Sequence, residues 1–153
     1  MDEAAAARDA ALRYLASADR SEDEVRRKLR QAGHAEETVE EALAFLRAAG
    51  LVDDVRLARD WTESRGIRRQ IGPRRLEAEL RRKGIDAEIV REAVEGLSEE
   101  QTVEAAIAYA LRRPDASRLD DPAARRRLCA ALQRRGYDWE TIEQVIAAIE
   151  ENQ

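Results

Sequence analysis

The chain is poor in cysteine, proline, glycine and aromatic residues, and it has no long apolar run. These shortages exclude several classes of structure. Cys129 is the only cysteine among 153 residues, so no intramolecular disulfide can form and a cytoplasmic location is expected. No run of about 18 apolar residues occurs, so we expect no membrane span. The N-terminus begins with acidic residues and has no basic start before an apolar run, so no signal peptide is expected.

The motifs of common enzyme and cofactor sites are also missing. His34 is the only histidine, and Cys129 has no second cysteine or histidine at ligand spacing, so we expect no metal site. Neither GxxxxGK[ST] nor GxGxxG occurs, which removes the usual signals of nucleotide binding. The carboxylates are abundant but lie in charged helical patterns without an apolar pocket. We therefore expect neither an enzyme nor a cofactor.

What the chain does have is charge and helix-forming residues. Charged residues make up 39% of the sequence, aromatic residues only 4%, and Ala, Leu, Arg and Glu dominate, which predicts an all-α protein. The net charge of −5 is unevenly distributed: residues 1–55 hold 8 Lys/Arg and 13 Asp/Glu, 56–97 hold 11 and 8, and 98–153 hold 8 and 11. A basic middle between acidic ends can attract an anionic partner.

A pattern of helix, glycine and helix occurs three times, as KLRQAGHAEETV (28–39), ELRRKGIDAEIV (79–90) and ALQRRGYDWETI (131–142). Aligning the glycines Gly33, Gly84 and Gly136 also aligns apolar positions at spacings typical of one helix face. These positions are Val25, Leu76, Leu128; Leu29, Leu80, Leu132; Val39, Val90, Ile142; Leu43, Val94, Ile146; and Leu46, Leu97, Ile149. Recurrence at this period is typical of stacked repeats, and each glycine is expected to end a helix with positive φ.

A leading helix precedes each pattern, over about residues 3–17, 54–69 and 99–112. The sequence thus predicts three tandem three-helix repeats, at 1–52, 53–97 and 98–153, the third with a longer first connection. Capping boxes at Ser21 and Ser98, and Asp121 before a proline, mark helix starts. The leading helices are expected to bury Leu12 and Leu15; Val55, Leu57, Ala58 and Trp61; and Val103, Ile107, Ala110 and Leu111.

Arginines gather near the ends of the second helices. Cations stabilise helix C-termini by about 0.3–1 kcal/mol each, which accounts for those that precede each glycine. It does not account for the arginines that flank the start of the middle second helix, within a segment (56–83) of ten Lys/Arg and four Asp/Glu. We expect a partner-binding or DNA-binding surface at Arg68, Arg69, Arg74, Arg75, Arg81, Arg82, Lys83, Arg134 and Arg135.

Helix, turn and helix also describes a DNA-reading motif, but the helix after each glycine is acidic here. Phosphates would repel it, which weighs against groove reading by that helix. Two alternatives to a regulatory function stay open: a DNA-binding helix-turn-helix-type module that acts alone, and a structural helical adaptor.

Four motifs in order resemble the RecX family of bacterial regulatory proteins, modulators of the RecA recombinase. They are RSEDEVRRKL (20–29), GLVDDVRLARDW (50–61), GPRRLEAELRRKGI (72–85) and LQRRGYDWETI (132–142). Leu57 stands where the family has an aromatic residue, and Tyr137 where phenylalanine is usual.

The resemblance implies an elongated, curved array of three helix-turn-helix-like repeats. It also implies a cytoplasmic function in recombination, DNA repair and the SOS response. A monomer would bind the RecA filament on single-stranded DNA and modulate, mostly inhibit, its growth, ATPase and strand exchange. DNA would be bound weakly or through the filament, and no catalytic residue or cofactor is implied.

Overall fold

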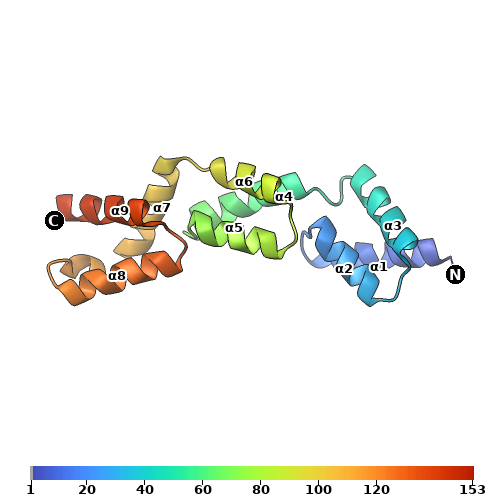
Figure 1. Ribbon diagram of the computed structural model, residues 1–153, viewed down its shortest axis with the longest axis horizontal. Coiled ribbons are helices and arrows are strands. Elements are labelled where there is room, and N and C mark those ends of the chain that lie inside the picture. The colour runs from blue at the N-terminus through green and yellow to red at the C-terminus, as the bar shows by residue number, and fades with distance from the viewer. Residues whose placement is uncertain (1) are drawn as a thin grey trace. The chain divides into compact units, whose positions relative to one another are not determined.

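The computed structural model describes residues 2–153, which form helices and no strands (Figure 1). The first repeat comprises α1 (Glu3–Ser17), α2 (Glu22–Gln31) and α3 (Glu36–Ala48). The second comprises α4 (Asp54–Trp61), the π-helix η1 (Thr62–Arg68), α5 (Pro73–Arg82) and α6 (Ala87–Glu95). The third comprises α7 (Glu99–Leu111), the 3₁₀ helix η2 (Pro114–Arg118), α8 (Pro122–Arg134) and α9 (Trp139–Glu151). The prediction of an all-α fold of three tandem three-helix repeats is confirmed.

The chain forms two compact units. Unit 1 contains the residues up to Ala58 together with Leu80–Val90, and unit 2 contains Arg59–Glu79 together with Arg91–Gln153. The repeat boundaries expected from the sequence stay a prediction, since the second repeat contributes to both units.

Aligned apolar residues build the core of each unit. In unit 1, Val25 and Leu29 of α2 meet Val39, Leu43 and Leu46 of α3, and all five side chains are fully buried. In unit 2, the corresponding core side chains are Leu128, Leu132, Ile142, Ile146 and Ile149. The 4-3-4 spacing places these residues on one face of each helix, so the repeat pattern also defines the cores.

Three residues of the leading helices were predicted to be buried, and the prediction was wrong. Leu12, Val55 and Leu111 are 39%, 56% and 62% exposed. In α1 the buried positions are Ala7 and Ala11. Ala11 and Leu12 are successive residues of a helix and therefore point about 100° apart.

The leading helix of the second repeat is not one continuous α-helix, as residues 54–69 were expected to be. It changes to the π-helix η1 at Thr62, and Gln70 just beyond it has φ 51°, the only positive φ at a non-glycine within residues 2–153. Gly66 in η1 packs closely, because an added Cβ would lie 3.0 Å from Leu76 Cδ1 and 3.1 Å from Leu97 Cδ1.

The helix ends follow the expected chemistry. Ser21 and Ser98 form capping boxes with Glu24 and Gln101, and Asp121 caps α8. Gly33, Gly84 and Gly136 have φ of 91°, 81° and 103°, so the predicted positive φ is confirmed at all three.

Candidate partner-binding site

The start of α5 crosses the turn between α8 and α9 in direct backbone contact, within unit 2. The Gly72 N–H donates to the Arg135 carbonyl (2.7 Å), and the Arg74 N–H donates to the Gly136 carbonyl (3.1 Å). A Cβ on Gly72 would lie only 2.3 Å from the Gly136 carbonyl carbon. Two glycines therefore allow a crossing that no larger residue fits, and we call it the glycine crossing.

Unit 1 contains an equivalent crossing. The Ser21 hydroxyl donates to the Lys83 carbonyl (2.5 Å), and a Cβ on Gly84 would lie 2.2 Å from Asp23 Oδ2. Ser21 and Gly72 both stand 12 residues before the glycine of their own repeat, while Lys83 and Arg135 both directly precede the glycine of the next. The second helices of the first two repeats, α2 and α5, thus begin against the following repeat's glycine turn. This contact is one physical reason for the recurring glycine.

The glycine crossing of unit 2 brings together six of the predicted site residues from three elements. Arg68 and Arg69 lie at the end of η1, Arg74 and Arg75 at the start of α5, and Arg134 and Arg135 at the end of α8. All are exposed except Arg135, which is half-buried. We call these six residues the arginine cluster: Arg68, Arg69, Arg74, Arg75, Arg134 and Arg135.

Arg135 is held inside the cluster by its own contacts. Its guanidinium donates to the carbonyls of Gln70 (2.8 Å) and Arg69 (2.5 Å) and lies 4.6 Å from the centre of the Tyr109 ring. Arg112 donates to Gln70 Oε1 (2.6 Å). Arg135 therefore fixes the loop before α5, including the strained Gln70, and its charge is less available to a partner than that of its neighbours.

Sequence reasoning missed three members of this site: Gln70, Tyr109 and Arg112. Arg112 and Gln70 are 42 residues apart, Arg135 and Gln70 are 65 apart, and Arg135 and Tyr109 are 26 apart, so no local pattern records these contacts. A weak signal was available, because Tyr109 and Arg112 stand three residues apart on one helix and can meet on its surface.

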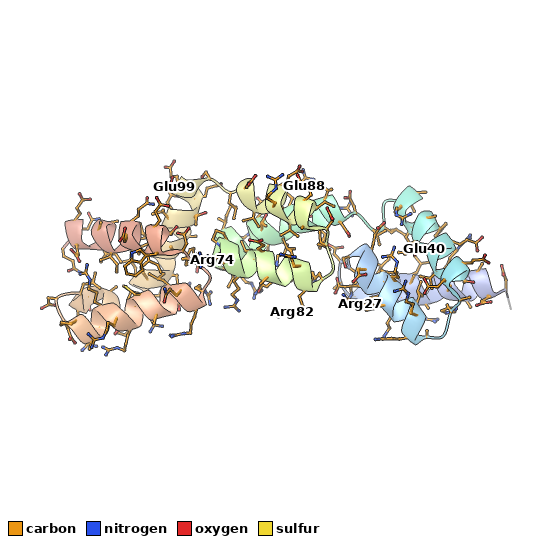
Figure 2. All side chains as sticks on the ribbon, viewed as in Figure 1. Arg27, Glu40, Arg74, Arg82, Glu88 and Glu99 are labelled. Carbon is orange, nitrogen blue, oxygen red and sulfur yellow. The ribbon has the colours of Figure 1, made fainter. Side chains whose placement is uncertain are left out.

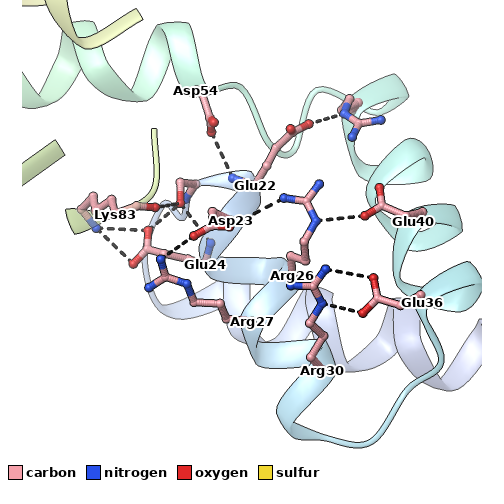
Figure 3. A network of polar contacts seen from close by, with 12 residues as sticks. Glu22, Asp23, Glu24, Arg26, Arg27, Arg30, Glu36, Glu40, Asp54 and Lys83 are labelled. Carbon is pink, nitrogen blue, oxygen red and sulfur yellow. Dashed lines mark hydrogen bonds and ion pairs between the residues drawn. The ribbon is translucent and has the colours of Figure 1, made fainter. Parts of the chain in front are cut away.

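The other three predicted residues lie in unit 1, where α5 ends. Arg81 and Arg82 are exposed (Figure 2 labels Arg74 and Arg82 near opposite ends of α5). Lys83 is different: its Nζ donates to Glu24 Oε1 (3.2 Å) and Oε2 (3.3 Å), and the side chain is 17% exposed. Lys83 thus belongs to the crossing of unit 1 (Figure 3).

The arginines of α2 and those of α5 differ in their ion pairing. On α2, Arg26 and Arg30 turn toward Glu40 and Glu36 of α3, at 2.9 and 2.6 Å (Figure 3). On α5, Arg75 is 3.7 Å from Glu79. Among residues 2–153, the remaining site arginines make no ion pair within 4.0 Å: Arg68, Arg69, Arg74, Arg81, Arg82 and Arg134.

Two carboxyls near the cluster are kept ionised. Hydrogen bonds from Thr141 lower the pKa of Asp138, and the charge of Arg74 lowers it further. Burial alone would raise the pKa of Glu79, but hydrogen bonds from Arg65 and Trp61 hold it below its usual value, and Arg75 adds to this. Arg65 donates to both Glu79 oxygens (2.8 and 2.7 Å), so this carboxylate ties η1 to α5.

The arrangement offers cation chemistry. In the part of the chain that the structure describes, no group of three or more His, Cys, Asp or Glu residues is placed to hold a metal ion. In the same part, every helix is too short or too polar to cross a membrane. The arginine cluster is thus a surface of exposed, mostly unpaired arginines at a backbone crossing, suited to an anionic partner.

Comparison with known proteins covers nearly the whole chain. Sequence models of the first, second and third three-helix domains of RecX match residues 7–46, 53–94 and 99–146. The regulatory protein RecX of Mycobacterium leprae (strain Br4923) is 37% identical over 145 residues, covering 93% of this chain and 84% of the relative. That of Chlorobaculum tepidum is 32% identical over 151 residues, covering 97% and 92%. The crystal structure of RecX from Lactobacillus salivarius matches in fold, with a TM-score of 0.88, 23% identity and 97% of each chain covered.

Proposed function

The chain belongs to the RecX family of regulatory proteins, and we propose that it binds the RecA recombinase filament on single-stranded DNA and mostly inhibits it. The inhibited steps are filament growth, ATP hydrolysis and strand exchange. In this proposal the protein acts as a cytoplasmic monomer without a catalytic residue or cofactor, and it contacts DNA weakly or through the filament.

The observation that carries the proposal is the arginine cluster of unit 2. Four of its exposed guanidiniums, those of Arg68, Arg69, Arg74 and Arg134, have no carboxylate of residues 2–153 within 4.0 Å, and Arg75 is 3.7 Å from Glu79, whereas Arg26 and Arg30 of α2 are paired with carboxylates of α3. A filament on DNA displays phosphates and acidic side chains, so unpaired arginines can steer the encounter and hold the complex. The acidic helices after each glycine turn argue against groove reading by the protein alone.

The deciding experiment measures ATP hydrolysis by RecA on single-stranded DNA with and without this protein. The proposal expects the rate to fall as the protein is added. An unchanged rate, together with salt-sensitive binding to bare single-stranded DNA, would favour a DNA-binding module that acts alone. Binding to neither RecA nor DNA would leave a structural adaptor.

A further inference from the structure

A groove in the third repeat lies outside the arginine cluster. The end of α7, helix η2 and the last turns of α9 form it within unit 2, and it has a volume of about 480 Å³. This is within the range of about 300–1,000 Å³ typical of ligand sites. Its walls are mostly apolar: Ile107, Leu111, Pro114, Ala116, Ala148 and Ile149.

The apolar wall is open to a partner. Leu111 is 62% exposed, the highest value among the large exposed apolar side chains of residues 2–153. Ala148, which also lines the groove, is small and half-buried. An exposed leucine beside a hollow apolar wall suits an inserted apolar side chain.

The charged side chains that line the groove are all positive. They belong to Arg112 and Arg113, the other polar lining residues are Ser117, Asn152 and Gln153, and no Asp or Glu among the described residues lines it. This is notable in a chain with 32 acidic and 27 basic residues. The groove therefore favours an acidic occupant.

Asp115, next to the groove in sequence, neutralises these charges only in part. It accepts from Arg127 Nε (3.1 Å) as well as from an Arg113 terminal nitrogen (3.3 Å), so one carboxylate faces two guanidiniums. Burial alone would raise the pKa of Asp115, but Arg127 and Arg113 hold it below its usual value. Moreover, Arg113 Nε is buried without a hydrogen-bond acceptor. A buried donor without an acceptor is costly.

We propose that this groove binds a short segment of the RecA protomer in which an apolar side chain stands beside Asp or Glu. The apolar side chain fills the space between Leu111 and Ala148, and the carboxylate accepts from Arg113 and Arg112. This inference rests on the proposed function. Arg112 also contacts Gln70 in the loop between Arg69 and α5, so one partner can cover both the arginine cluster and the groove.

Two substitutions test the groove in the RecA ATPase assay. Ala148→Trp fills it, and Leu111→Ser removes the exposed apolar wall with little risk to folding. The matched control is Ala147→Trp, which places the same bulk at an exposed α9 position that does not line this groove. We expect each test variant to raise the concentration for half-inhibition about tenfold and the control to leave it unchanged, with helicity and melting preserved in all three. Inhibition equal to the parent's by both test variants would overturn the inference.

A second measurement separates failure of the groove from failure of the proposed function. Methyl NMR of the parent is recorded with the peptide Glu-Leu-Asp-Phe-Glu-Leu-Asp-Phe, with its Lys-substituted counterpart, and with decanoate. The inference expects the acidic peptide to shift the methyls of Leu111, Ile107 and Ile149 in the parent but not in Ala148→Trp. Equal shifts from the lysine peptide, or shifts from decanoate alone, would overturn it even if the parent inhibits RecA. If the parent does not inhibit RecA, the proposed function fails, and the peptide result still decides what the groove binds.

Discussion

At the residue scale, the three aligned glycines share a conformation but not an environment. An added Cβ on Gly33 meets nothing within 4 Å, whereas one on Gly136 would lie 2.7 Å from the Arg75 backbone nitrogen. On Gly84 it would meet the Asp23 side chain, which has some freedom to move. Positive φ therefore explains all three glycines, and close backbone contact adds a second reason at Gly136.

Alanine at each glycine should reveal these two contributions. Gly33→Ala should destabilise by about 1 kcal/mol, from strain at positive φ alone. Gly136→Ala should cost about 1–3 kcal/mol more, since the crossing must move apart, and Gly84→Ala should fall between. Denaturant unfolding measures all three; equal losses would mean that the crossings add nothing.

Glu79 gives a prediction for pH. Its folded pKa lies below its ordinary value of 4.5, so its stabilisation is present above that value and is lost as the pH falls through the folded pKa. Glu79→Gln should therefore cost about 1.5 kcal/mol at pH 7, and the difference from the parent should vanish in acid. The matched control is Glu77→Gln, at an exposed position of the same helix, with a change within about 0.5 kcal/mol. If Glu79→Gln is still less stable than the parent at a pH where Glu79 is protonated, the charge of Glu79 is not the cause of the stability difference.

At the element scale, Ser21 and Ser98 carry the same capping box in different settings. Both accept from the backbone N–H three residues later, but only Ser21 is fully buried and also donates to the Lys83 carbonyl. Ser98 therefore caps α7, whereas Ser21 caps α2 and also joins α2 to the turn at Gly84.

Alanine substitution should separate the cap from the crossing. Ser98→Ala should cost about 1 kcal/mol for the lost cap. Ser21→Ala should cost about 1–3 kcal/mol more, because the partly buried Lys83 carbonyl loses a donor. Thermal melting of both variants is the measurement. Equal shifts would indicate that the crossing of unit 1 does not contribute to stability.

The same elements show what the sequence could and could not predict. Spacing and capping chemistry are local, so the helices, the positive φ of the glycines and most buried positions followed from the sequence. The π-helix η1 and the exposure of Leu111 did not, because they depend on how elements pack. Arg135 shows the limit for the site. The sequence grouped it with its neighbours as a binding residue, but two of its guanidinium nitrogens donate to carbonyls 65 and 66 residues away.

At the scale of the whole molecule, the central claim is that the exposed arginines of the arginine cluster hold the RecA filament. Its test changes Arg68, Arg69, Arg74 and Arg75 to Ser. The matched control changes Arg13, Arg59, Arg118 and Arg126, four exposed arginines outside the cluster. Removing four positive charges takes the net charge from −5 to −9 in both variants, so any difference between them reports position rather than total charge.

The most direct measurement is the inhibition of RecA ATP hydrolysis on single-stranded DNA by the parent and both variants. We expect the cluster variant to need at least about tenfold more protein for half-inhibition, roughly 1.4 kcal/mol, with helicity and melting nearly unchanged. The control variant should stay close to the parent, and the parent's inhibition should weaken as salt rises from about 50 to about 200 mM. Inhibition by the cluster variant equal to the parent's at both salt concentrations would contradict the account and leave these arginines as a solvated surface.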